Sequence, residues 1–222
     1  MIVTIDGPAG AGKSTVARAL AQRLGFGYLD TGAMYRAVAY AGLRAGIDLS
    51  RPQELAALAR RVRIEVDGAA IRLDGDDVTA AIRSSEVTAA TRYSADHPEV
   101  RARLVELQRA WAVGRNLVTE GRDQGTVAFP DAGCKIFLTA SVGERARRRL
   151  ADLQSQGETA DLDQVLADIA RRDAGDAARE VGPLRRADDA VELCTDGMSP
   201  DQVVERLAEI VLAVRGREGT AP

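Results

Sequence analysis

Several residue types are scarce in this chain, and each scarcity narrows what the protein can be. The 222 residues include two cysteines, Cys134 and Cys194, so we expect no disulfide framework, and a reducing compartment fits. The single histidine, His97, has no cysteine or histidine cluster around it in the sequence that would suggest structural zinc. Aromatic residues make up 4% of the chain, so Ala, Val, Leu and Ile must fill the core.

Long apolar runs and a surplus of basic residues are also missing. No stretch approaches the roughly 20 apolar residues of a membrane helix, and Met1 leads into a very short apolar run without a basic start, so we expect no signal peptide. The formal net charge is -3, which argues against a nucleic-acid binder, because such proteins usually have a basic surface. We therefore expect a cytoplasmic protein whose partners include neither nucleic acid nor membrane.

Hydrophobic periodicity predicts an alternation of strands and helices. Short apolar runs predict strands at residues 2–5, 26–29, 117–120, 135–139 and 191–193. A spacing of three to four residues predicts helices at 15–24, 33–45, 98–113, 142–153, 162–173 and 200–214, with a break at Ser155-Gln156-Gly157 and a frayed tail from Arg215. This alternation predicts an α/β fold class with a central parallel sheet and helices on both of its faces.

The middle of the chain follows a different pattern. Residues 62–66 and 70–73 alternate apolar and polar side chains, and Asp67-Gly68 and Asp74-Gly75 are turn signals. The pattern predicts a small antiparallel sheet with one wet face. We therefore expect an inserted subdomain at residues 62–114 within a core formed by residues 1–61 and 115–222.

One segment predicts the chemistry. The pattern G-x-x-x-x-G-K-[ST] is matched at every fixed position by Gly7-Pro8-Ala9-Gly10-Ala11-Gly12-Lys13-Ser14, with Thr15 next, between a predicted strand and a predicted helix. Glycines let successive backbone N–H groups curl around a phosphate, and the helix N-terminus adds partial positive charge. Lys13 would reach the β- and γ-phosphates of ATP, and the Ser14 hydroxyl would bind Mg²⁺.

A phosphate loop alone indicates only a nucleoside triphosphate. The chain lacks the N-K-x-D segment of GTPases and is short for a motor or transport ATPase, which favours a small kinase. Four segments together resemble the bacterial cytidylate kinase family: residues 5–15, residues 29–36, residues 120–127 with 129–132, and Arg171-Arg172-Asp173 with Asp176 and Arg179. The similarity runs in order over nearly the whole chain.

The resemblance implies a P-loop NTPase fold in three layers, with an inserted subdomain that binds a nucleoside monophosphate and a helical lid at about 148–180. It implies ATP-dependent phosphorylation of CMP and dCMP to CDP and dCDP. Side chains that donate hydrogen bonds would hold the acceptor's phosphate: Thr31, Arg36 and Arg122. The cytosine edge, whose N4 amine a carboxylate can accept, would be read by Arg101 and Asp123. The sugar hydroxyls would be held by Arg172 and Asp176, with Arg179 near the base.

An arginine cluster lies where this family has its mobile lid. Its members are Arg145, Arg147, Arg148 and Arg149. A closed lid would exclude water and surround the transferring group with positive charge. We expect Arg148 and Arg149 to act in catalysis together with Lys13 and Arg122, and a solvated helix face is the alternative interpretation of the cluster.

Three positions depart from the family pattern. Arg92 stands where a serine that contacts the base is common, and Thr91 and Ser94 are the neighbouring hydroxyls. Cys194 stands where the family often has Asp, near the edge of the adenine site. Gly175 stands where some members have another arginine.

Two alternatives stay open. The first is a P-loop kinase for another acceptor, such as AMP, UMP, shikimate or dephospho-coenzyme A, and the Asp123–Arg101 pair favours cytosine over these. The second is a non-catalytic sensor that binds ATP and signals to a partner, and an intact Lys13 and Ser14 beside a full acceptor set argue against it. We expect a monomer whose partners are the small molecules CMP, dCMP and ATP.

Overall fold

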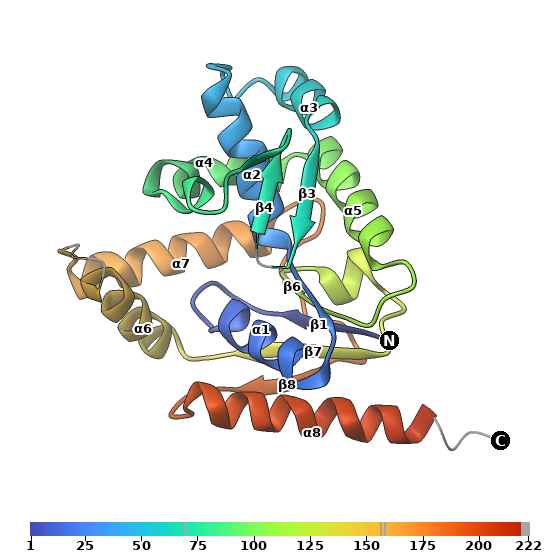
Figure 1. Cartoon of the computed structure of the whole chain (residues 1–222). Helices are drawn as coiled ribbons and strands as arrows, with labels where there is room; N and C mark the ends of the chain where they lie inside the picture. The colour runs from blue at the N-terminus through green and yellow to red at the C-terminus, as the bar shows by residue number, and fades with distance from the viewer. Residues whose placement is uncertain (69, 156, 158, 219–222) are drawn as a thin grey trace. The chain divides into compact units, whose positions relative to one another are not determined.

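The computed structural model describes residues 1–68, 70–155, 157 and 159–218, and the chain forms two compact units (Figure 1). The first unit contains Met1–Phe26 and the chain from Asn116 onward, and the second is Gly27–Arg115. The second unit therefore begins at Gly27, whereas the sequence placed the start of the insert at Val62. The predicted end of the insert, Gly114, lies one residue from the observed boundary.

Four parallel strands form the sheet of the first unit. They are β1 (Ile2–Asp6), β6 (Leu117–Gly121), β7 (Cys134–Thr139) and β8 (Val191–Cys194), in the order β6-β1-β7-β8. In β1, Val3 pairs with Val118 on one side and Cys134 on the other, and Val3 and Ile5 are fully buried. A parallel strand covered on both faces has such a continuous apolar run, which is why the sequence predicts these strands.

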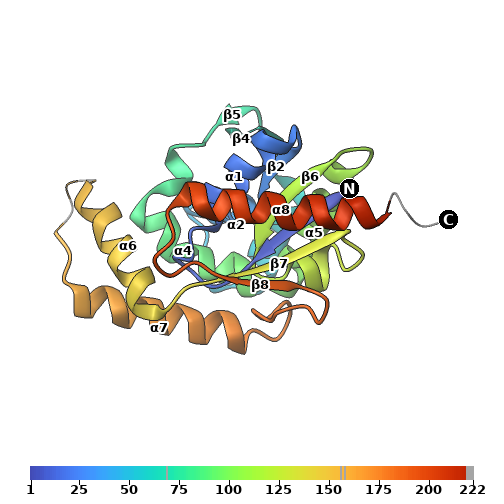
Figure 2. The same ribbon diagram turned by 90° about the horizontal axis from the view of Figure 1, so that it is seen from below.

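Helices complete the first unit. Helix α1 (Lys13–Leu24) packs on β6 and on α8 (Pro200–Glu218), and Leu20 and Leu207 are fully buried. Helices α6 (Val142–Ser155) and α7 (Leu162–Ala178) pack on each other, away from α8 in Figures 1 and 2. A three-layer P-loop arrangement with a helical hairpin is thus confirmed.

Two helix ends differ from the prediction, and a third agrees with it. Helix α7 continues beyond residue 173 to Ala178. The apolar period did not predict these last turns, because they bury Asp176 rather than an apolar residue. Helix α8 continues to Glu218, so the expectation of a frayed tail from Arg215 is wrong for residues 215–218. Helix α6 ends at Ser155, as the predicted break requires, and Gln156 of that break lies outside the described residues.

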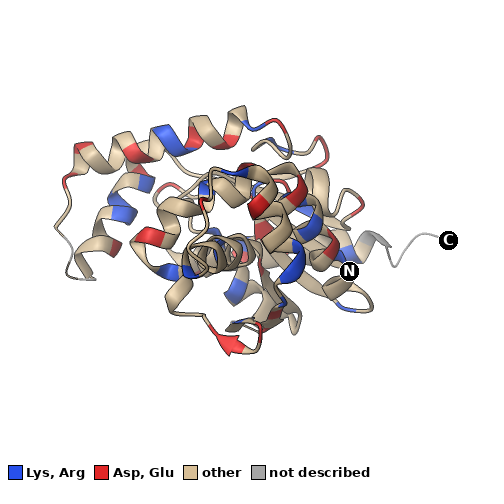
Figure 3. Ribbon diagram, turned by 90° about the horizontal axis from the view of Figure 1, so that it is seen from above, with Lys and Arg blue, Asp and Glu red and all other residues tan. Residues whose placement is uncertain are grey.

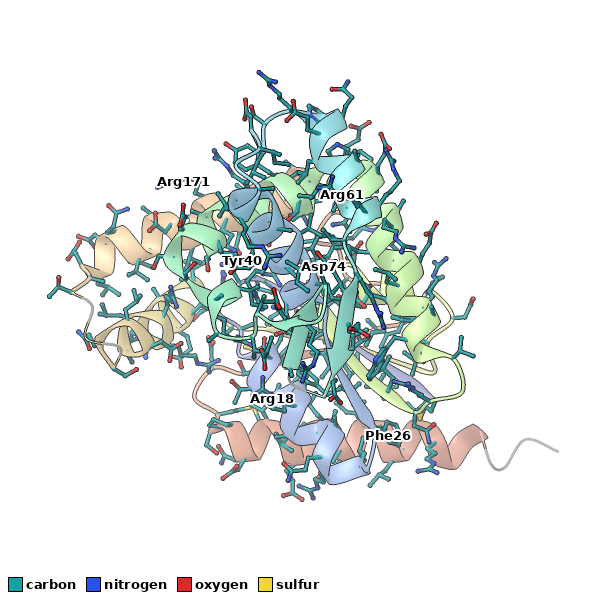
Figure 4. All side chains as sticks on the ribbon, turned by 45° about the horizontal axis from the view of Figure 1, so that its top comes forward. Arg18, Phe26, Tyr40, Arg61, Asp74 and Arg171 are labelled. Carbon is teal, nitrogen blue, oxygen red and sulfur yellow. The ribbon has the colours of Figure 1, made fainter. Side chains whose placement is uncertain are left out.

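The second unit combines the predicted antiparallel sheet with helices. Its elements are β2 (Gly27–Asp30), α2 (Thr31–Arg44), α3 (Pro52–Arg61), β3 (Ile64–Asp67), β4 (Ala70–Leu73), β5 (Asp76–Asp77), a 3₁₀ turn (Ala81–Arg83), α4 (Ser85–Asp96) and α5 (Pro98–Ala112). Strands β3 and β4 pair antiparallel, with Ile64 opposite Leu73. Asp74, labelled in Figure 4, has a φ of 54° in the turn that follows β4, so the predicted turn is confirmed.

Helices α3 and α4 are additions to the sequence prediction. Helix α3 begins at Pro52 and buries Leu55 and Leu58. Helix α4 begins after Ser84, whose hydroxyl oxygen accepts the N–H of Val87 at 3.3 Å as an N-cap. Helix α3 buries Leu55 and Leu58 at helical spacing, so its apolar period was present in the sequence and was missed, whereas the only large apolar residue that α4 buries is Val87.

The described helices carry charge of both signs, as Figure 3 shows by the interspersed blue and red bands. Within the described residues, no helix combines the length and apolar character that a membrane span requires.

The contact between α1 and α8 should contribute strongly to stability. Leu207→Ala removes a fully buried side chain and should lower the free energy of unfolding by about 2–5 kcal/mol. Leu212→Ala on the same helix is the matched control, because Leu212 is 55% exposed, and it should cost less than about 0.5 kcal/mol. Urea unfolding of both variants checks this, and equal losses would contradict the packing described.

Candidate active site

The predicted phosphate loop lies between β1 and α1. Gly7 has a φ of 151°, and a Cβ at this position would collide with the carbonyl oxygen of Leu138 in β7. Gly12 has a φ of 86° and is the N-cap of α1. Both positions require glycine, so the loop follows a backbone path that other residues would strain.

Lys13 is the buried cation of this loop. Its side chain lies in the first turn of α1, the residue is 5% exposed, and Nζ donates a hydrogen bond to the Pro8 carbonyl at 2.7 Å. Burial, and then the charge of Arg122, lowers the pKa of Lys13 to about 7. The neighbouring carboxylates therefore do not fully balance the positive charge of the ammonium. An anion bound to the loop would stabilise its charged form.

Ser14 faces a carboxylate at the end of β6. Its Oγ donates a hydrogen bond to Oε1 of Glu120 at 2.6 Å, and Glu120 is 5% exposed. A hydroxyl and a carboxylate are the hard oxygen ligands that Mg²⁺ prefers. In the described ranges, no group of three or more His, Cys, Asp or Glu could hold a metal ion.

Asp6, at the end of β1, holds the segment that follows β6. Its carboxylate accepts the N–H of Gln124 at 2.8 Å and of Gly125 at 2.7 Å. These residues begin a π-helical turn (Gln124–Ala128) directly after Arg122 and Asp123. A Cβ on Gly125 would lie 3.0 Å from Thr4 Oγ1, so the turn packs closely on β1. Burial raises the pKa of Asp6 to about 6.

An ion-pair cluster brings together three of the predicted acceptor residues. Arg122 Nε and Arg179 Nη2 donate to opposite oxygens of Asp176, at 2.6 and 2.7 Å. Although burial opposes it, the charge of Arg122 and its hydrogen bond hold the pKa of Asp176 below its usual range. Arg172 is exposed on the same helix, and its charge acts on both Asp176 and Lys13. Asp123 is buried.

The second unit holds Thr31, Arg36 and Arg101. Thr31 is buried as the first residue of α2. The N-cap of this helix is Asp30, which accepts the N–H of Ala33 at 2.8 Å and Nη2 of Arg36 at 3.2 Å. The carboxylate of Asp30 thus orients Arg36 while it caps the helix.

Arg101 is fixed inside the second unit. It is 3% exposed, its Nη1 donates to the Ala95 carbonyl at 2.9 Å, and its guanidinium carbon lies 5.4 Å from the centre of the Tyr35 ring. Ser94 Oγ lies 2.9 Å from the Tyr35 carbonyl oxygen. Arg92 is exposed and donates to the Tyr93 hydroxyl at 2.9 Å.

The four arginines of the lid cluster differ in environment. Arg145 is 4% exposed and makes three polar contacts. Arg148 bonds to Glu144 and Thr195, and Arg147 pairs with the same Glu144. Arg149 is exposed. Arg148 Nη1 would lie 3.8 Å from a Cβ placed on Gly12, so it is close to the phosphate loop.

Sequence reasoning missed the acidic partners of the predicted cations. Asp6 and Glu120 each stand at the carboxyl end of a buried strand, and Asp30 stands directly before α2. A charged residue that ends an apolar run next to a glycine-rich loop is the signal that could have pointed to them.

A parallel sheet whose first strand leads through a glycine-rich loop to a buried lysine defines the P-loop nucleotide-binding class. The model of the cytidylate kinase family matches residues 3–213. The chain therefore belongs to the cytidylate kinase family.

Relatives that are similar in sequence belong to the same family. The chain is 50% identical over 211 residues to a cytidylate kinase of Rhodopirellula baltica, covering 95% of this chain and 92% of that one. It is 46% identical over 226 residues to a cytidylate kinase of Geobacter sulfurreducens, covering 100% and 96%. A solved structure of TT1252 from Thermus thermophilus shares the fold, with a TM-score of 0.50, 23% identity and 96% coverage of each chain.

The buried Asp6 carboxyl should make stability depend on pH. The folded pKa of about 6 lies above the ordinary 3.8, so the folded chain binds more protons than the unfolded chain between these values. Stability from this group is therefore present at low pH and is lost as pH rises to 6. From pH 5 to pH 7, the free energy of unfolding of the wild type should fall by about 1 kcal/mol relative to Asp6→Asn. Urea unfolding at each pH measures this, and a constant difference would contradict it.

Proposed function

We propose that this chain transfers the γ-phosphoryl group of ATP to CMP and dCMP, giving ADP and CDP or dCDP. Membership of the cytidylate kinase family supports the acceptor class. The observation that supports the chemistry best is the buried Lys13 in the first turn of α1, beside Arg122 and directly after the glycine-rich loop.

Donor binding rests on the first unit. The amides of residues 7–15 and the Lys13 ammonium would hold the β- and γ-phosphates. The Ser14 hydroxyl and the Glu120 carboxylate would hold Mg²⁺, which would supply positive charge that stabilises the β- and γ-phosphates. Lys13 would keep its proton, because phosphate oxygens favour the charged form.

The acceptor residues come from both units. Thr31 and Arg36 of the second unit and Arg122 of the first would orient the acceptor phosphate. Its oxygen attacks the γ-phosphorus in line, the new P–O bond forms, and the bond to the bridging oxygen of ADP breaks. Transfer needs alignment and charge stabilisation rather than a protein nucleophile, and arginine forks supply both.

The remaining predicted residues would serve recognition and closure. Arg101 and Asp123 would read the cytosine edge, Arg172 and Asp176 the sugar hydroxyls, and Arg179 would lie near the base. Arg148 and Arg149 would act from the lid, and the position of Arg148 near Gly12 favours it over the exposed Arg149. We propose that the chain acts as a monomer on cytoplasmic nucleotides.

A coupled ADP-release assay tests the proposal. With ATP and magnesium, CMP and dCMP should have higher kcat/KM values than UMP, AMP, shikimate or dephospho-coenzyme A. Lys13→Met should lower kcat by about a hundredfold or more, because it removes a charge that the transition state needs. Lys135→Met, which replaces the chain's other lysine, should retain activity within about twofold, since Lys135 pairs with Asp189 instead. Preference for a purine or a non-nucleotide, or full turnover by Lys13→Met, would overturn the proposal.

Asp123→Asn tests how the base is read. A carboxylate accepts the N4 amine of cytosine, whereas an amide can instead donate to O4 of uracil. The ratio of kcat/KM for CMP to that for UMP should therefore fall by about tenfold or more. The KM for ATP reports on the donor site and should stay within about twofold. An unchanged CMP-to-UMP ratio would show that Asp123 does not contact the base.

A further inference from the structure

Arg145 makes hydrogen bonds to three separate segments of the first unit. Its Nε donates to the Ala140 carbonyl at 3.0 Å, just before α6, and its Nη1 donates to the Ala9 carbonyl of the phosphate loop at 3.0 Å. The same Nη1 lies 2.6 Å from Oδ2 of Asp173 in α7. Because Arg145 is only 4% exposed, these contacts are shielded from water and stronger than surface contacts.

The two helices that Arg145 joins have an apolar core of their own. We call α6 and α7 the lid hairpin. Ala146, Val165 and Ile169 are buried between the two helices, with Leu150, Leu153 and Leu166 packed around them. The hairpin therefore has its own cohesion, and Arg145 is a direct polar link from it to the phosphate loop.

The phosphate loop approaches Arg145 closely at Gly10. This glycine has a φ of 77°, and a Cβ on it would lie 3.2 Å from the Cβ of Arg145. A planar trans peptide directs its C=O and N–H in opposite directions. Anchoring the Ala9 carbonyl on Arg145 therefore directs the Gly10 N–H away from Arg145.

Asp173 depends on the same guanidinium. Its Oδ2 bonds to Arg145, while its Oδ1 is buried and has no hydrogen-bond partner among residues 1–68, 70–155, 157 and 159–218. Asp173 is partly exposed, but its shielded Oδ1 is costly without a paired charge, so Arg145 fixes this point of α7 as well.

We infer that Arg145 is a positioning residue that fixes the Ala9–Gly10 peptide for donor binding and joins the phosphate loop to the lid hairpin. This role goes beyond the proposed function and rests on it only for the identity of the donor. It also differs from the sequence expectation, which selected Arg148 and Arg149. A lysine at position 145 would keep the charge but lacks the planar fork that reaches acceptors in three directions.

The test compares Arg145→Lys with Arg206→Lys, a control in the same unit whose exposed side chain pairs with Glu209. Binding of ATP without acceptor is measured by titration calorimetry, and KM is measured for ATP and CMP separately. Arg145→Lys should raise the Kd and KM for ATP by about tenfold, through the loss of a charge-assisted hydrogen bond. The KM for CMP should stay within about twofold, and Arg206→Lys should behave as wild type.

A second variant keeps the inference testable if Arg145→Lys folds poorly. Asp173→Asn leaves the bonds to Ala9 and Ala140 in place and should raise the Kd for ATP by a smaller factor. The double variant should bind ATP no more weakly than Arg145→Lys alone, because both changes break one link. An ATP affinity within twofold of wild type in Arg145→Lys, with only a lower melting temperature, would overturn the inference, and so would an unchanged ATP affinity in folded Asp173→Asn. Because the titration needs no acceptor, failure to phosphorylate CMP would count against the proposed function alone.

Discussion

Positive charge at the carboxyl ends of β1 and β6 is the constraint that organises the first unit. Lys13 is nearly inaccessible to water and lies close enough to Arg122 for the two cations to oppose each other. Carboxylates offset this repulsion only in part, because burial also disfavours their ionised forms. The lowered pKa of Lys13 and the raised pKa of Asp6 are two consequences of the same shortage of solvent and counter-charge. On the proposed function, the phosphates of a nucleotide would add negative charge here.

Each arginine assigned to the acceptor phosphate is already oriented by a carboxylate. Asp176 holds Arg122 in the first unit, and Asp30 holds Arg36 in the second. A guanidinium that is held in place loses less conformational freedom when it binds a ligand. The arriving anion must, however, compete with an internal carboxylate for the same donors. On the proposed function, this competition would disfavour weakly charged ligands, so the carboxylates would add selectivity for a phosphate dianion.

Local patterns in the sequence predicted the phosphate loop and the β3–β4 hairpin, because the signals for each lie within a few consecutive residues. We did not predict α3, although Pro52 marks its start and Leu55 and Leu58 recur at helical spacing, or α4, whose buried face is mostly small residues. Long-range pairings were beyond local patterns altogether. Asp6 and Gly125 are 119 residues apart, and nothing in either segment indicates that one binds the other. The family resemblance proposed Arg122 and Asp176 as site residues, but not the ion pair between them.

Arg92 stands where the family commonly has a serine that contacts the base. On the proposed function, other residues must therefore recognise the base. Thr91 donates its hydroxyl to the Val87 carbonyl at 2.6 Å, and Ser94 Oγ lies within hydrogen-bonding distance of two backbone carbonyls. Each hydroxyl proton is therefore already directed to a backbone carbonyl. To a bound ligand, both hydroxyls offer lone pairs that accept a hydrogen bond. On the proposed function, Arg101 would be the side chain of the second unit that donates to the base, and a guanidinium suits the ring acceptors of cytosine and uracil alike. Discrimination between the two bases would then rest on the 4-position, where an amine replaces a carbonyl and only a carboxylate such as Asp123 favours the amine.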